Sequence, residues 1–89
     1  MNTYSCIIVD DEPYAIEGLK TYIDLIPNLE VIKSYTDPLY ALTDINSIGN
    51  VDLILLDIDM PMITGIELSK QVRQKTEKLV FTTAFTQYG

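Results

Sequence analysis

The chain has 89 residues, of which 47% are hydrophobic and 21% charged, so its composition is that of one small folded domain and not of a disordered segment. Thirteen acidic residues against six basic ones give a formal net charge of -7. This balance argues against sequence-independent binding of nucleic acid, which needs a basic surface. The absence of histidine excludes the most common general base and phosphate carrier.

Three features of the sequence indicate where the protein works. No stretch approaches the roughly 20 apolar residues of a membrane-spanning helix, so no contact with a membrane is expected. The first residues lack the basic segment and the long apolar core of a signal peptide. The single cysteine, Cys6, lies in an apolar segment and cannot form an intramolecular disulfide. A cytoplasmic protein is the simplest expectation.

The chain alternates between short apolar segments and segments with helical periodicity. Residues 5–10 are the first predicted strand, a short apolar run bounded by polar residues. A helix is predicted over residues 13–26, where Pro13 suits the first turn and Asp11 or Glu12 can cap it. Its apolar residues recur at spacings of three and four and predict one buried side, formed by Ile16, Leu19, Ile23 and Ile26.

The same alternation continues along the rest of the sequence. Residues 29–35 are predicted as a strand, and their alternating polarity is typical of a strand at a sheet edge. Thr64 and Glu67 have the spacing of a capping box at the start of a helix. The further predicted elements are a helix over 38–45 with Leu39, Leu42 and Ile45 inward, a strand over 51–57, a helix over 65–74 and a strand over 79–83.

Strands that alternate with helices predict an α/β fold. Its strands are parallel, its crossovers are right-handed, and its helices cover both faces of the sheet. The four glycines form no glycine-rich phosphate loop, which counts against nucleotide binding by the Rossmann or P-loop devices.

Carboxylates stand at the ends of two predicted strands. Asp10 and Asp11 follow the first strand, and Asp57 ends the third. The carboxyl ends of parallel strands form the crevice where ligands bind, so these three side chains are expected to converge there. Mg2+ takes one or two carboxylates together with substrate oxygens, and it removes the repulsion that would raise a carboxylate pKa. The pattern predicts a Mg2+ site at which Asp57 can act as a nucleophile toward phosphorus.

Simpler roles stay open for the same residues. Asp57 can cap the turn that follows it, and Asp11 or Glu12 can cap the first helix. Thr83 ends the fourth predicted strand, where its hydroxyl would lie near Asp57 and could donate to a phosphoryl oxygen. For Thr82 the role of a strand-forming residue is preferred.

These residues resemble the receiver domain of two-component response regulators, in order and approximate spacing over all 89 residues. The sequence VDDEP at residues 9–13 is similar to the acidic pair of that family. The sequence LLDIDMP at residues 55–61, followed by Gly65, is similar to its phosphoacceptor segment. Thr83 and Ala84 are similar to its switch residue and the alanine after it. Residues 7–13 and 81–85 are most similar to regulators that carry a LytTR-type DNA-binding domain.

The resemblance implies a flavodoxin-like (CheY-like), doubly wound parallel sheet and a role for each site residue. Asp57 would accept a phosphoryl group from a partner histidine kinase, and Thr83 would supply the switch hydroxyl. Asp10, Asp11 and Asp57 would hold Mg2+, with the backbone carbonyl of Asp59 completing the metal shell. Such a domain is an autocatalytic phosphoacceptor and not a turnover enzyme.

The match stops after the fourth strand of a five-stranded family fold. Residues 1–89 would be a receiver domain without its C-terminal third, namely the fourth helix, the fifth strand with its terminal lysine, and the fifth helix. The expected strand order is therefore 2-1-3-4. The fourth strand would be an exposed apolar edge, through which a dimer or a swapped assembly is expected. DNA binding would belong to an output domain outside this chain, and no direct nucleic-acid contact by the chain is expected.

Two other functions are considered beside phosphoacceptance. Asp57 and Asp59 have the spacing of the nucleophile pair of haloacid-dehalogenase-type phosphatases, but Pro61 stands where that family has Thr or Val. The short motif alone is weak support. The other alternative is an interaction module that dimerises independently of phosphorylation, which an absence of Mg2+ binding would favour.

Overall fold

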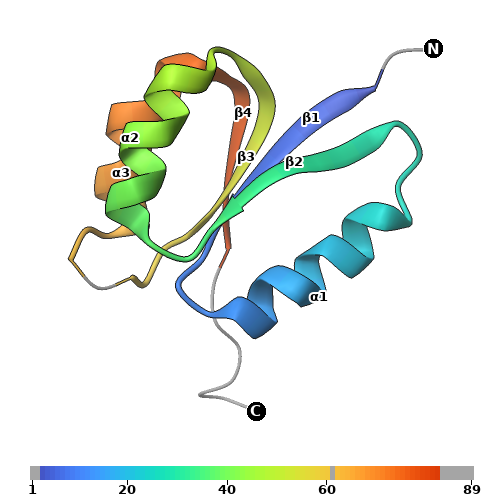
Figure 1. Cartoon of the computed structure of the whole chain (residues 1–89), viewed down its shortest axis with the longest axis horizontal. Coiled ribbons are helices and arrows are strands. Elements are labelled where there is room, and N and C mark those ends of the chain that lie inside the picture. The colour runs from blue at the N-terminus through green and yellow to red at the C-terminus, as the bar shows by residue number, and fades with distance from the viewer. Residues whose placement is uncertain (1–2, 61, 83–89) are drawn as a thin grey trace.

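The computed structural model describes residues 3–60 and 62–82. Within them, four parallel strands form one sheet in the order β2-β1-β3-β4, which confirms the predicted order. Figure 1 shows α2 and α3 on one side of the sheet and α1 on the other. The elements are β1 (Tyr4–Val9), α1 (Pro13–Asp24), β2 (Leu29–Tyr35), α2 (Pro38–Ile48), β3 (Val51–Asp57), α3 (Gly65–Val72), the 3-10 turn η1 (Arg73–Lys75) and β4 (Thr76–Thr82).

Each side of the sheet has its own apolar core, because successive residues of a strand point to opposite faces. On the side of α2 and α3, Ile7 and Ile54 pack with Leu68 of α3 and other buried residues. On the side of α1, Cys6 and Ile8 pack with Ile16 and Ile23, and the β3 residues Leu53 and Leu55 are only partly buried. From Cys6 to Val9 both faces of β1 are therefore buried, which explains why these four residues are all apolar.

The edge strand β4 is longer at its start than the sequence predicted. It begins at Thr76 and not at residue 79, because Thr76 and Lys78 already pair with Val51 and Leu53 of β3. The apolar run that predicted the strand begins only at residue 79, because the residues before it are polar. An edge strand can carry polar side chains, since one of its flanks is open to solvent.

The buried stripe of α2 differs from the predicted one. Its buried residues are Pro38, Ala41 and Ile45, at spacings of three and four. Leu39 lies one position away from this stripe and is 41% exposed, so the prediction that it points inward is wrong. Ile26 was also assigned to a buried side, but α1 ends at Asp24 and Ile26 is exposed.

Two of the three described helices are capped by a side chain at their start, and the capping box predicted for α3 is confirmed. Asp37 accepts hydrogen bonds from the backbone N–H groups of Leu39 and Tyr40 at 2.9 and 3.4 Å. Thr64 and Glu67 form the complete capping box at the start of α3. At α1 the prediction is wrong, because Glu12 occupies the N-cap position without a side-chain hydrogen bond.

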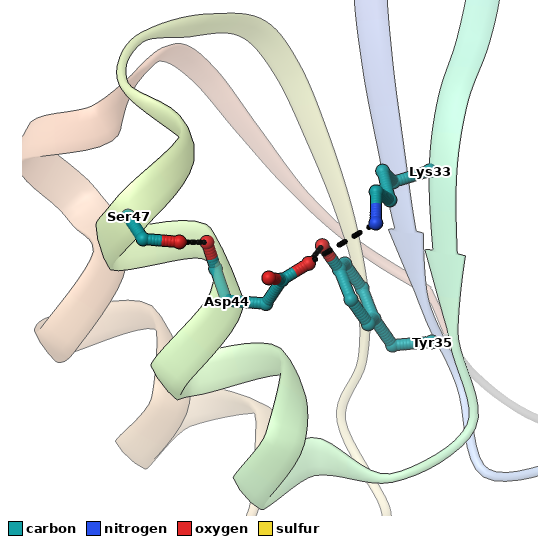
Figure 2. A network of polar contacts seen from close by, with 4 residues as sticks. All are labelled: Lys33, Tyr35, Asp44 and Ser47. Carbon is teal, nitrogen blue, oxygen red and sulfur yellow. Dashed lines mark hydrogen bonds and ion pairs between the residues drawn. The ribbon is translucent and has the colours of Figure 1, made fainter.

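A polar network joins the other edge strand, β2, to α2 (Figure 2). The hydroxyl of the buried Tyr35 donates to Oδ2 of Asp44 at 2.5 Å, and Nζ of Lys33 lies 3.4 Å from the same oxygen. Ser47 donates to the backbone carbonyl of Asp44 at 2.8 Å. The hydrogen bond from Tyr35, helped by Lys33, holds the pKa of Asp44 below its usual value. The network therefore satisfies a buried hydroxyl while it fixes α2 against the sheet.

We expect Thr64→Ala to lower the free energy of unfolding by about 1 kcal/mol, because it removes the acceptor of the Glu67 N–H at an exposed helix start. Urea denaturation measures the change. The matched control, Thr64→Ser, keeps the hydroxyl and should stay within about 0.5 kcal/mol of the unsubstituted chain. Equal losses in the two variants would contradict the capping role.

Candidate functional site

The carboxyl edge of the sheet brings three carboxylates together. Val9 of β1 pairs with Leu56 of β3, so the next residue of each strand, Asp10 and Asp57, lies at the same level of the sheet. Asp10, Asp11 and Asp57 each offer an oxygen within 4.8 Å of the others. The convergence that the sequence predicted for these side chains is confirmed.

Asp10 and Asp57 each organise the turn that follows their strand. Oδ1 of Asp10 accepts a hydrogen bond from the backbone N–H of Glu12 at 2.9 Å, and Oδ1 of Asp57 accepts one from that of Asp59 at 3.3 Å. Both are turns in which an aspartate binds the N–H two residues later. The turn-capping role considered for Asp57 is therefore present, and it leaves a second oxygen on each carboxylate for a ligand.

Burial and mutual repulsion make ionisation of the carboxylates in this cluster unfavourable. Asp57 is 4% exposed and Asp10 is 6% exposed. Burial raises the pKa of Asp57 to about 6, and the negative charges of Asp10 and Asp11 add to that shift against the opposing hydrogen bond from Asp59. Burial also raises the pKa of Asp10, with a smaller contribution from the charge of Asp11.

No compensating ion pair reaches these carboxylates within the described residues, where the two ion pairs are Lys20–Glu17 and Lys33–Asp44. Several hard oxygen donors at one anionic point fit a divalent cation such as Mg2+. The donor set of this chain is therefore consistent with the predicted metal.

The loop after Asp57 returns to the end of β3 at Gly65. The backbone N–H of Gly65 donates to the carbonyl of Ile58 at 2.9 Å. A Cβ on Gly65 would lie 2.8 Å from the carbonyl carbon of Asp57 and 2.9 Å from Cα of Ile58, which is too close for a side chain. Sequence reasoning placed Gly65 in a motif but missed this contact, whose only signal was a glycine directly after the capping Thr64.

The remaining predicted site residues have different positions. Asp59 is exposed, and its backbone N–H belongs to the turn of Asp57. Thr82 pairs with Asp57, and its hydroxyl donates to the carbonyl of Leu56 at 3.4 Å, in agreement with the structural role preferred for it. Thr83 and Pro61 lie outside the described residues.

Comparison with known proteins gives one consistent family. The model of the response regulator receiver domain matches residues 6–88. An uncharacterized response regulatory protein of Vibrio parahaemolyticus is 35% identical over 86 residues, which are 96% of this chain and 35% of that protein. The transcriptional regulatory protein BtsR of Escherichia coli K12 is 30% identical over 84 residues, 93% of this chain and 35% of BtsR. The chain thus spans about a third of the length of these curated relatives.

A solved structure agrees with the sequence matches. The response regulator domain of Thermotoga maritima CheB superimposes with a TM-score of 0.78 at 29% identity, over 99% of this chain and 66% of that one. Among the helices of the described residues, none has the length and apolar character needed to cross a membrane.

The raised pKa of Asp57 predicts a pH-dependent stability. Between about pH 4 and pH 6 the folded chain holds a proton on Asp57 that the unfolded chain has lost, so stability falls as the pH rises through this range. Asp57→Asn should therefore be more stable than the unsubstituted chain above pH 6, by about 1 to 2 kcal/mol after screening by nearby water. The gain should fall to about 0.3 kcal/mol or less at pH 3.5, where the carboxyl is mostly protonated in both states.

Urea denaturation in the presence of a chelator, at both ends of this pH range, measures the difference. Asp24→Asn removes an exposed carboxylate of α1 and should show no such pH-dependent gain. A gain of the same size in both variants would mean that net charge and not the cluster is responsible.

Proposed function

The chain belongs to the family of response regulator receiver domains, and on this premise we propose that Asp57 accepts a phosphoryl group from a histidine kinase with the help of Mg2+. Receiver domains are modules of two-component signalling and not turnover enzymes. One observation carries the assignment of Asp57: it ends β3 inside a cluster in which Asp10, Asp11 and Asp57 offer oxygens within 4.8 Å of one another.

In the proposed metal site, carboxylate oxygens of Asp10, Asp11 and Asp57 and the backbone carbonyl of Asp59 hold Mg2+. When bound, the cation neutralises the cluster and the charge of a phosphoryl group next to it. The proposal is supported by the raised pKa values of Asp10 and Asp57, which indicate charges without a nearby compensating group.

The side chain of Asp57 performs the transfer. Above its pKa of about 6 the carboxylate is ionised, and the N–H of Asp59 on Oδ1 orients it so that the other oxygen is available for attack. That oxygen forms a bond to phosphorus while the phosphorus–nitrogen bond of the donor phosphohistidine breaks, and the electron pair leaves with the donor nitrogen. We assign to Thr83, outside the described residues, a hydrogen bond from its hydroxyl to a phosphoryl oxygen.

The signalling output lies outside this chain in our proposal. BtsR is by name a transcriptional regulatory protein, which supports a cytoplasmic protein whose DNA binding resides in another domain. The share of the CheB domain that the chain covers, 66%, supports the reading of residues 1–89 as a receiver domain without its C-terminal third.

Self-association through β4 is the second element of the proposal. β4 is the last strand in the order of the described sheet, and Val80 and Phe81 on it are 44% and 39% exposed. A strand of this kind is a template for pairing with another chain. This observation also favours the alternative function, an interaction module that dimerises without phosphorylation.

We expect the chain to gain one phosphoryl group when it is incubated with a small phosphodonor and Mg2+, as intact mass spectrometry measures. Asp57→Asn should gain none, and omission of Mg2+ should abolish the gain. Asp59→Asn keeps the backbone carbonyl of residue 59 and should still be modified. Modification of Asp57→Asn to the same extent would refute the assigned acceptor.

Binding of Mg2+ can be tested without phosphorylation. Mg2+ should raise the urea midpoint of the unsubstituted chain, because it binds the folded cluster and not the unfolded chain. Asp10→Asn should require about tenfold more Mg2+ or a larger excess for the same rise, since loss of a ligand costs at least as much as loss of its supporting contacts. An unsubstituted chain that shows neither this rise nor modification would favour the interaction module.

A further inference from the structure

The end of β2 holds the backbone of one member of the acidic cluster. Tyr35, the last residue of β2, pairs with Val9 of β1, and its carbonyl accepts the backbone N–H of Asp10 at 3.0 Å. Asp10 is the first residue after β1 and offers its carboxylate to the cluster. A shift in the carbonyl of Tyr35 would therefore move the backbone from which that carboxylate projects.

A β-bulge separates this end of β2 from its start. Cys6 pairs with Val31 and Ile7 pairs with Lys33, so Ile32 is an extra residue in β2. A bulge leaves one residue unpaired and interrupts the ladder of hydrogen bonds locally. Three pairs with β1 follow it, and β2 is the outermost strand on its side of the described sheet. Backbone pairing alone therefore holds the end of β2 weakly.

Side-chain contacts with α2 give the end of β2 a second support (Figure 2). The hydroxyl of Tyr35 donates to Oδ2 of Asp44 at 2.5 Å, and Nζ of Lys33 lies 3.4 Å from the same oxygen. Two of the three residues that pair with β1 after the bulge are thus joined to one carboxylate of α2. The ring of Tyr35 also meets the ring of Tyr40 edge to face, with 5.7 Å between the centroids.

The hydroxyl of Tyr35 contributes to this support beyond the packing of its ring. The side chain is 4% exposed, and a phenylalanine ring would fill nearly the same space. Such a ring would leave the pair of Lys33 with Asp44, but ion pairs that are open to solvent contribute little. Burial, together with the hydrogen bond to Asp44, raises the pKa of Tyr35, so the hydroxyl keeps its proton and remains the donor at neutral pH.

We propose that Tyr35 is a positioning residue of the metal site: its hydrogen bond to Asp44 fixes the end of β2, and its carbonyl thereby holds Asp10 in the geometry that binds Mg2+. The inference rests on the proposed function, in which Asp10 is a ligand of the cation. Mg2+ demands a nearly ideal octahedral arrangement of ligands, so a small displacement of one carboxylate weakens binding. Because Oδ1 of Asp10 accepts the N–H of Glu12 at 2.9 Å, the direction of its second oxygen follows the backbone.

Amide hydrogen exchange of Tyr35→Phe tests the support of the strand end without metal or phosphodonor. Relative to the amides of Ile7 and Ile8, the amide of Asp10 should exchange about fivefold faster, because the strand end opens more often while the core stays closed. Ile45→Val is the matched control, since it removes one methyl group from the core on α2 and keeps the hydrogen bond of Tyr35. It should leave this ratio of exchange rates unchanged.

The effect on the metal site is tested by titration with Mg2+, followed through the amide chemical shifts of the folded chain. Tyr35→Phe should raise the dissociation constant about three- to tenfold, because a direct supporting contact of a metal ligand is worth about tenfold or more and Tyr35 acts one residue further away. Tyr22→Phe removes the hydroxyl of an exposed tyrosine of α1, and Ile45→Val lowers stability without changing the network. Both should retain the dissociation constant of the unsubstituted chain.

A second pair of variants breaks the same hydrogen bond from its other end. Asp44→Ala should weaken Mg2+ binding by a similar factor, whereas Asp24→Ala removes an exposed carboxylate of α1 and controls for the loss of one negative charge. The double variant Tyr35→Phe, Asp44→Ala should bind Mg2+ no more weakly than Asp44→Ala alone, because both changes remove one interaction. Effects that multiply in the double variant would contradict the shared mechanism.

The outcomes separate this inference from the proposed function. If the unsubstituted chain binds Mg2+ and Tyr35→Phe binds it equally well, the proposed metal site stands and the positioning role of Tyr35 is wrong. If Asp10 exchanges no faster in Tyr35→Phe than in Ile45→Val, the hydroxyl contributes only to overall stability and the role is likewise wrong. If the unsubstituted chain binds no Mg2+, the metal site itself falls, and the role of Tyr35 falls with it.

Discussion

The parallel pairing of Val9 with Leu56 is the contact on which the acidic site depends, because it sets Asp10 and Asp57 at one level where β1 and β3 end. Side chains alternate between the faces of a sheet, so a shift of one residue in this register would send one of the two carboxylates to the opposite face. The register is held by apolar residues on both faces of β1, which are fully buried from Cys6 through Val9. The core of the sheet therefore determines the geometry of the site.

The cluster of Asp10, Asp11 and Asp57 lowers the stability of the folded domain when its carboxylates are ionised. Burial and mutual repulsion raise the pKa of Asp57 to about 6, so the folded state is less stable with all three carboxylates ionised. Such groups are typical of functional sites, where stability is given up for a charge that a ligand later neutralises. The turns after β1 and β3 limit this cost, since Glu12 and Asp59 each donate a backbone N–H to the aspartate before them.

The two faces of the described sheet are covered unevenly. α2 and α3 pack on one face over a continuous core, and the network of Tyr35, Asp44 and Lys33 fixes α2 to β2. On the other face, Leu53 and Leu55 of β3 remain partly exposed beside Val80 of β4. These residues lie on the same face of the sheet as Asp57, so the less covered face is also the one that carries the acidic site.

The sequence by itself determined the order of the elements and the convergence of Asp10, Asp11 and Asp57, because apolar runs, cap residues and strand ends are local signals that parallel topology turns into positions. The strand order was predicted only through the resemblance to receiver domains. The sequence predicted strand bounds and side-chain burial poorly where contacts with another strand or helix decide them. β4 starts at Thr76 because β3 pairs with it there, and Leu39 is exposed because Pro38, Ala41 and Ile45 meet the sheet instead. The pKa of Asp57 and the contact between Gly65 and the end of β3 also depend on the fold, since burial and close approach join residues that are distant in the chain.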